Sequence, residues 1–137
     1  MPKIIAIDIS GSNVSDEVGF KRTMRYAIAN ANPAAKVYFY GMAIHGPYDL
    51  DKAEQALESA LSSRGMNNPI ANDYGWGSIE KNVYDLAYSQ HAHVVMVTDN
   101  VPLMMQEAAM TAIDLVVNRD TVYSTEIQKP FRSIKVV

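Results

Sequence analysis

The sequence contains no cysteine among its 137 residues. Disulfide bonds, zinc sites built on thiolates and a cysteine nucleophile are therefore all excluded for this chain. A bound metal ion would need oxygen or imidazole ligands instead. The sequence also lacks any apolar run near the roughly 20 residues that span a bilayer, and its start lacks the pattern of a signal peptide. We therefore expect a cytoplasmic protein with no membrane partner.

Neither basic nor acidic residues are in large excess. The chain has 12 lysines and arginines against 15 aspartates and glutamates, for a formal net charge of -3. Because proteins bind nucleic acid largely through basic side chains on phosphates, nucleic acid is not an expected partner. Hydrophobic residues make up 48% of the chain, which is enough for one sizeable core. We expect a single domain over residues 1–137, with the structure of the tail at 119–137 left open.

Short apolar runs alternate with segments of helical periodicity along the chain. The predicted strands are 3–9, 36–42, 93–98, 113–117 and 133–137. The predicted helices run from about 16 to 31, 51 to 64, 78 to 90 and 100 to 112. This alternation predicts an α/β fold with an open, mostly parallel, doubly wound sheet and helices on both faces. We expect five or six strands, with 3–9 in the centre between 36–42 and 93–98.

Two features between these elements are less regular. No hairpin strand is evident after 36–42, and His45, beside Gly46 and Pro47, is interpreted as a turn residue. Ser15 is interpreted as the cap of the first helix. Residues 65–77 form the longest stretch without a period, and a loop of this length in a small domain is often functional.

Three polar segments lie at predicted strand ends or before a helix. Asp8 lies at the end of the first strand and Ser10 and Ser12 come just after it, and alternation directs their side chains the same way. The segment Thr98-Asp99-Asn100 follows the strand at 93–98, and Gly75-Trp76-Gly77-Ser78 places a hydroxyl at a helix start. Ligands of open α/β sheets bind beyond the carboxyl ends of the strands, so these segments are the candidate site.

Carboxylates and hydroxyls are hard oxygen ligands of the kind that Mg²⁺ or Mn²⁺ prefers. We expect one ion to be shared by five residues, namely Asp8, Ser10, Ser12, Ser78 and Asp99. Because Mg²⁺ keeps several waters and needs few direct ligands, one coordination position is left for an outside oxygen, most usefully a carboxylate. The sequence therefore predicts a metal-dependent docking point.

The D-x-S-x-S run at 8–12, the Gly-rich loop with Ser78 and the T-D turn at 98–99 resemble the metal-ion-dependent adhesion site of von Willebrand factor A domains. Their order along the chain is also similar, and the resemblance covers residues 3–118 as an order of elements. It implies a Rossmann-like three-layer sandwich. It also implies that Ser10, Ser12 and Ser78 contact the metal, while Asp8 and Asp99 hold coordinated waters or approach the ion directly.

These observations favour a non-enzymatic module that binds a protein partner through an Asp or Glu side chain. An exposed Trp76, joined by Tyr74 and Asn100, is the predicted partner surface. The sequence has no Ser-His-Asp order, P-loop or H-E-x-x-H motif. One alternative is a Mg²⁺-dependent phosphotransfer or nucleotide-binding enzyme that uses Asp8 and Asp99. Another is a structural subunit with a vestigial site. The sequence does not decide between a monomer and a homo-oligomer.

Overall fold

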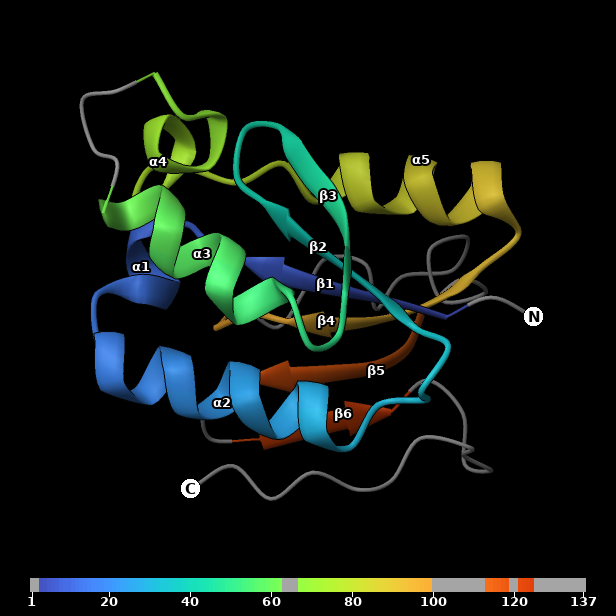
Figure 1. The fold of residues 1–137 in the computed structure, drawn as a ribbon. Coiled ribbons are helices and arrows are strands. Elements are labelled where there is room, and N and C mark those ends of the chain that lie inside the picture. Colours follow the sequence, from blue (N-terminus) through green and yellow to red (C-terminus); the bar gives the residue numbers. More distant parts are fainter. Residues whose placement is uncertain (1–2, 63–66, 100–112, 119–120, 125–137) are drawn as a thin grey trace.

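Six strands form one open sheet in the computed structural model, which describes residues 3–62, 67–99, 113–118 and 121–124. The strands are β1 (Lys3–Asp8), β2 (Lys36–Tyr40), β3 (Ile44–Asp49), β4 (His93–Val97), β5 (Ile113–Asn118) and β6 (Thr121–Ser124). Their order across the sheet is β3-β2-β1-β4-β5-β6 (Figure 1). The four inner strands are parallel, whereas β3 and β6 run antiparallel at the edges. The predicted α/β class, the mostly parallel open sheet and the central position of β1 are confirmed.

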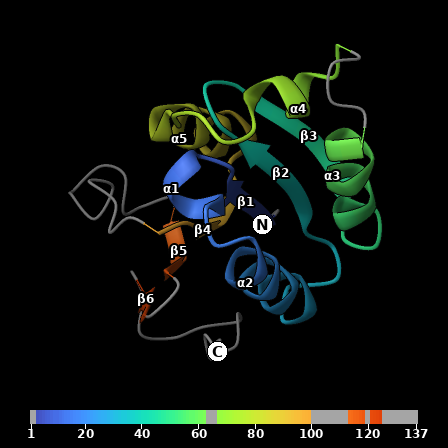
Figure 2. The ribbon, with the colours of Figure 1, turned by 90° about the vertical axis from the view of Figure 1, so that its left-hand side faces the viewer.

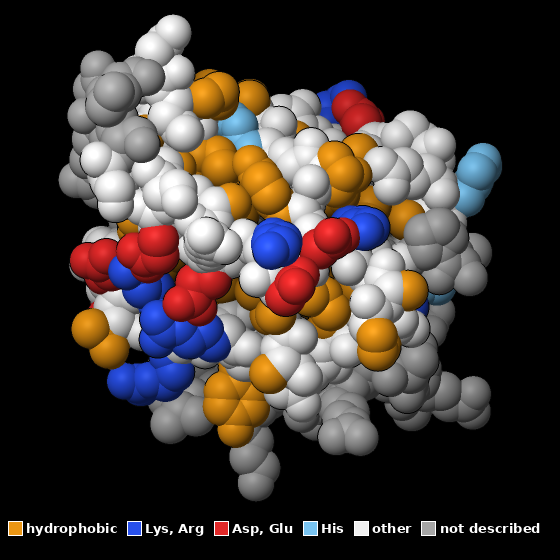
Figure 3. All heavy atoms as spheres, viewed as in Figure 1, with side chains coloured by type: hydrophobic (Ala, Val, Ile, Leu, Met, Phe, Trp, Pro, Cys, Tyr) orange, Lys and Arg blue, Asp and Glu red, His pale blue; other side chains and the backbone are white. Residues whose placement is uncertain are grey.

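Helices lie on both faces of this sheet (Figure 2). The helices are α1 (Gly11–Val14), α2 (Glu17–Ala29), α3 (Ala53–Ser62), α4 (Pro69–Asp73) and α5 (Glu80–Gln90). One hydrophobic core joins α2 and α3 to the sheet, and a second core joins α5 to the opposite face. Ion pairs between α2 and α3, such as Arg25 with Glu54, mix both signs of charge over that outer surface (Figure 3).

Side chains along β1 alternate between the two faces of the sheet, so this one strand contributes to both cores. Ile5 and Ile7 belong to the core under α2 and α3, while Ile4 and Ala6 belong to the core under α5. All four are buried, so the strand reads as an uninterrupted apolar run in the sequence. The same alternation places Asp8, the last residue of β1, on the α5 face at the carboxyl end of the sheet.

Helix starts differ from two sequence predictions. α2 is capped by Asp16, whose side chain accepts a hydrogen bond from the Gly19 amide, and not by Ser15. Ser15 instead donates its hydroxyl to the Ser12 carbonyl oxygen. α5 begins at Glu80 after the N-cap residue Ile79, so Ser78 lies before the helix and not at its start as predicted.

The region after β2 also differs from the prediction. A hairpin strand, β3, pairs antiparallel with β2, and His45 belongs to this strand and is not a turn residue. The segment IHGPYD has no apolar alternation, so a partly exposed edge strand of this kind has no clear pattern in the sequence. Within 65–77, a short helix α4 begins after Asn68, whose side chain accepts from the Ile70 and Ala71 amides.

Some predictions fall outside the described residues. These are the helix at 100–112, the strand at 133–137 and the position of Asn100. A single domain over 1–137 stays a prediction. In the described part of the chain, no helix combines the length and apolar character needed to cross a membrane.

Candidate functional site

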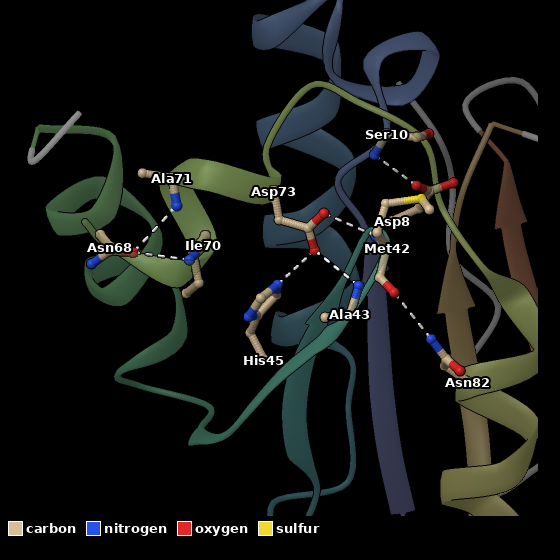
Figure 4. Close-up of polar contacts among 10 residues, drawn as sticks. All are labelled: Asp8, Ser10, Met42, Ala43, His45, Asn68, Ile70, Ala71, Asp73 and Asn82. Atoms are coloured by element: carbon tan, nitrogen blue, oxygen red, sulfur yellow. Dashed lines mark hydrogen bonds and ion pairs between the residues drawn. The ribbon is translucent and has the colours of Figure 1, made fainter. Parts of the chain in front are cut away.

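Asp8 is held firmly at the end of the central strand. Its Oδ1 atom accepts a hydrogen bond from the Ser10 amide at 2.8 Å, and Oδ2 accepts one from the Thr98 hydroxyl at 2.6 Å. The Asn13 side-chain amide donates to the Asp8 carbonyl oxygen at 2.6 Å. Figure 4 shows Asp8 and Ser10 together at the end of β1. Because both carboxylate oxygens already accept donors, Asp8 orients the turn that carries the two serines.

The environment of Asp8 disfavours its negative charge. Burial raises the pKa of this carboxyl, the hydrogen bonds from Thr98 and Ser10 oppose the rise, and the nearby charge of Asp99 adds to it. Asp8 is only 1% exposed, so water screens this repulsion weakly. A cation placed beside Asp8 and Asp99 would relieve both effects.

The two serines of the turn lie side by side. Ser10 precedes the short helix α1 and Ser12 lies within it, and their Oγ atoms are 3.5 Å apart. Ser10 is buried and Ser12 is exposed, so the pair extends from the end of the core to the surface. The structure therefore brings Asp8, Ser10 and Ser12 together, with Asp99 close enough to act on the charge of Asp8.

Backbone hydrogen bonds hold the loop with Ser78 across the same end of the sheet. The Gly75 amide donates to the Ile9 carbonyl oxygen, the Gly11 amide donates to that of Trp76 at 2.7 Å, and the Ile79 amide donates to that of Gly41. A Cβ on Gly11 would lie 2.7 Å from the Gly75 oxygen, so this close approach requires glycine.

Ser78 lies between the Trp76 and Ile79 anchors of this loop and is half-buried. No hydrogen bond joins its hydroxyl to Asp8 or Ser10 in the described part of the chain. The structure therefore puts Ser78 at the expected end of the sheet without a hydrogen bond to those two residues. Its role as a metal ligand stays a prediction.

Glu80 is an acidic neighbour that the sequence analysis missed. It begins α5, and its Oε2 atom accepts a hydrogen bond from the Tyr84 hydroxyl at 3.1 Å. Burial raises the pKa of Glu80, the bond from Tyr84 opposes the rise, and the charge of Asp8 adds to it. Across residues 3–62, 67–99, 113–118 and 121–124, no three His, Asp or Glu side chains cluster tightly enough to hold a metal. An ion here would need the hydroxyl oxygens as well as the carboxylates.

A second buried aspartate lies at the turn between β2 and β3. The Asp73 carboxylate accepts hydrogen bonds from the Met42 amide at 2.9 Å and the Ala43 amide at 3.1 Å. It also lies 2.7 Å from the His45 Nε2 atom, as Figure 4 shows. Burial acts to raise the pKa of Asp73, but the bonds from His45, Met42 and Ala43 outweigh it and lower the pKa. This cluster ties α4 to the β2–β3 hairpin.

An apolar surface adjoins this cluster. Trp76 is 70% exposed and Met42 is 55% exposed. Both line a shallow groove of about 490 Å³, whose lining residues are Met42, Ala43, His45, Pro69, Asn72, Asp73 and Trp76. Tyr74 differs from the predicted partner surface, because its ring is partly buried and packs edge-on against Phe20 at a centroid distance of 6.4 Å.

The Asp73 cluster joins residues 28 to 31 positions apart, so no local spacing in the sequence indicates it. The one available signal is an aspartate within the aperiodic stretch at 65–77. No family model, curated protein or solved structure matches the chain. The site is therefore interpreted from its own geometry and chemistry.

Proposed function

We propose that this protein is a divalent-metal-dependent binding module that accepts a partner's Asp or Glu side chain at the carboxyl end of the sheet. The ion would be Mg²⁺ or Mn²⁺, and the proposed ligand set is Asp8, Ser10, Ser12, Ser78 and Asp99. The observation that carries the proposal is the Asp8 turn, in which a fixed carboxylate accepts the Ser10 amide and two serine hydroxyls lie 3.5 Å apart. This arrangement fits the von Willebrand factor A-like reading of the sequence.

Electrostatics support a cation at this position. Asp99 lies close enough to Asp8 for its charge to raise the pKa of Asp8, and the charge of Asp8 in turn raises the pKa of Glu80. A divalent ion neutralises such a group of acids and leaves attraction for one further carboxylate. Hydroxyl and carboxylate oxygens favour a hard ion, which keeps some of its waters and can exchange one for a partner oxygen.

The loop beside the proposed site supports a protein partner. Trp76 is exposed, yet its backbone is anchored to Gly11 and lies between further anchors at Gly75 and Ile79. A large aromatic side chain on a fixed backbone loses little conformational entropy when a partner covers it. Tryptophans of this kind dominate binding energy at protein interfaces. We assign Trp76 to the partner surface and propose no catalytic step.

Calorimetric titration of metal-free protein with Mg²⁺ and Mn²⁺ tests the proposal. Wild-type protein is expected to bind one ion, and Asp8→Ala and Asp99→Ala are expected to lose most of that affinity. Because Asp8 also supports the fold, Ser12→Ala provides a second test at an exposed residue. The matched control is Ser15→Ala, which removes an exposed hydroxyl three residues away and should bind normally.

Trp76 fluorescence supplies an independent readout, because the loop that carries this indole is hydrogen-bonded to Gly11 and should respond to metal and then to an acidic peptide. Wild-type protein that binds neither ion would contradict the proposal and favour a structural subunit. Release of phosphate from a nucleotide only when Mg²⁺ is present would favour the phosphotransfer alternative. Acidic-peptide binding that persists unchanged in chelator would show that the metal has no role in docking.

A further inference from the structure

Three polar side chains lie side by side at the carboxyl end of the sheet, on the face that α5 covers. Asp8 of β1 pairs with Tyr40 of β2 in parallel register. Thr98 follows Val97, which pairs with Ile7, so Thr98 lies on the other side of Asp8. The Thr98 hydroxyl donates to Asp8, which confirms that the two side chains meet. These three side chains therefore form one polar row, Tyr40, Asp8 and Thr98, where the core under α5 ends.

The Tyr40 hydroxyl is the unexplained member of this row. Tyr40 is 0% exposed, and its hydroxyl has no hydrogen-bond partner of normal geometry in the described part of the chain. The adjacent Thr98 hydroxyl, which acts to lower the pKa of Tyr40, directs its own proton to Asp8. A buried polar group without a partner lowers stability, so such groups are rare and require an explanation.

Tyr38 shows that the unmet hydroxyl is specific to the end of the strand. It lies two residues earlier in β2 and belongs to the same core under α5. Its hydroxyl accepts a hydrogen bond from the Gln90 side-chain amide at 3.0 Å. The same residue type on the same face is therefore satisfied within the fold at position 38 and unsatisfied beside Asp8.

The groups around the Tyr40 hydroxyl are mostly acids and hydroxyls. Burial raises the pKa of Tyr40 well above its ordinary value, and the charges of Asp8 and Glu80 and the Tyr84 hydroxyl add to the rise. Glu80, whose charge acts on Tyr40, accepts a hydrogen bond from the Tyr84 hydroxyl. The hydroxyl thus belongs to a side chain beside Asp8 in the sheet and within reach of the charges of Asp8 and Glu80.

We propose that Tyr40 and Glu80 form the outer sphere of this ion site, where their oxygens accept hydrogen bonds from water molecules bound to the ion. The inference rests on the proposed function, since it needs a hydrated ion beside Asp8. Mg²⁺ keeps several waters when few protein ligands are available. Waters on a divalent ion are strong hydrogen-bond donors, and carboxylates and hydroxyls in the protein are their natural acceptors.

Tyr40→Phe separates this role from a purely structural one. Without metal, the variant removes a buried group that has no partner, so its stability in chelator should equal or exceed that of wild type. Its Mg²⁺ affinity should fall about 10-fold, the lower range for losing an outer-sphere partner. The matched control, Tyr38→Phe, loses the bond from Gln90 and should be less stable with unchanged Mg²⁺ affinity.

Two further measurements sharpen the test. Glu80→Gln keeps the shape of the side chain but weakens it as an acceptor, and it should also lower Mg²⁺ affinity by several-fold. With Mn²⁺ bound at saturation, water-proton relaxation should show faster exchange of the ion's waters in Tyr40→Phe than in wild type. A change in folding stability alone would not produce this difference.

The outcomes distinguish this inference from the proposed function. If wild type binds Mg²⁺ or Mn²⁺ and Tyr40→Phe binds with equal affinity and equal water exchange, the outer-sphere role is wrong and the ion site stands. Wild-type protein that binds neither ion overturns both. Lower affinity in Tyr40→Phe together with unchanged affinity in Tyr38→Phe supports the inference.

Discussion

The two buried aspartates at the carboxyl end of the sheet differ in how the fold treats their charge. Asp8 is 1% exposed and Asp73 is 9% exposed, and each accepts at least one backbone amide. Burial is the largest influence on both groups, yet the pKa of Asp8 is raised and that of Asp73 is lowered. Asp73 receives two amides and His45, whereas Asp8 has one amide, the hydroxyls of Thr98 and Ser10, and the repelling charge of Asp99.

This difference separates a structural acid from a candidate binding acid. The hydrogen bonds to Asp73 stabilise its negative charge and also join α4 to the hairpin, so the fold itself supplies what the carboxylate needs. The charge of Asp8 is not fully compensated within the fold. An additional positive charge would therefore stabilise the region around Asp8 and contribute little at Asp73.

The largest expected effect is the loss of Asp73. Asp73→Ala leaves the Met42 and Ala43 amides and the His45 ring without their acceptor, and losing one partner of a buried polar cluster costs about 3 kcal/mol. Urea denaturation should show this decrease in the free energy of unfolding. Asp85→Ala, which removes an exposed pair with Lys81, is the control and should cost under about 0.5 kcal/mol. A loss below about 1 kcal/mol for Asp73→Ala would contradict the structural role of this acid.

A smaller effect is expected at Gly41, which admits the Asp73 carboxylate. A Cβ at this position would lie 2.7 Å from Asp73 Oδ1, so Gly41→Ala should cost about 2 kcal/mol by overpacking. In the Asp73→Ala background, the same substitution should cost much less, because the clashing group is gone. Gly77→Ala serves as the control, since its Cβ would meet only the flexible Met42 sulfur at 3.4 Å. Equal costs of Gly41→Ala in both backgrounds would show that the carboxylate does not fill this space.

The smallest effect is a difference in pH dependence, measured without metal. Asp73 has a pKa below its ordinary value of 3.8, so its ionisation contributes stability above pH 3.8 that is lost as pH falls through the lowered pKa. Asp8 has a raised pKa, so its buried charge costs stability at neutral pH, and this cost is relieved as pH falls through the raised pKa toward 3.8.

As pH falls from 7 to 3, denaturation should therefore show wild type losing stability relative to Asp73→Asn and gaining stability relative to Asp8→Asn. As pH falls, the advantage of wild type over Asp73→Asn should shrink only below pH 3.8. Wild type should gain stability relative to Asp8→Asn in the range above 3.8. Parallel curves for both variants would remove the contrast between the two aspartates.

Sequence reasoning succeeded where one strand or helix carries its own pattern. The run at 3–9 predicts β1 because both of its faces are buried, and the similar runs at 36–42, 93–98 and 113–117 predict the other parallel strands. It failed for β3, because a partly exposed edge strand with glycine and proline lacks that pattern. The α4 helix is short and begins with the Asn68 cap, so no apolar period marks it.

The same division applies to the candidate site. Asp8 at the end of the central strand and Ser10 and Ser12 just after it are neighbours in the chain, so their grouping is predictable without a structure. Folding is what brings Tyr40 and Thr98 to either side of Asp8 and Asp73 against the Met42 and Ala43 amides. Contacts of this kind depend on strand register and on how the crossing loops pack, and residues 28 to 90 positions apart carry no local signal of them.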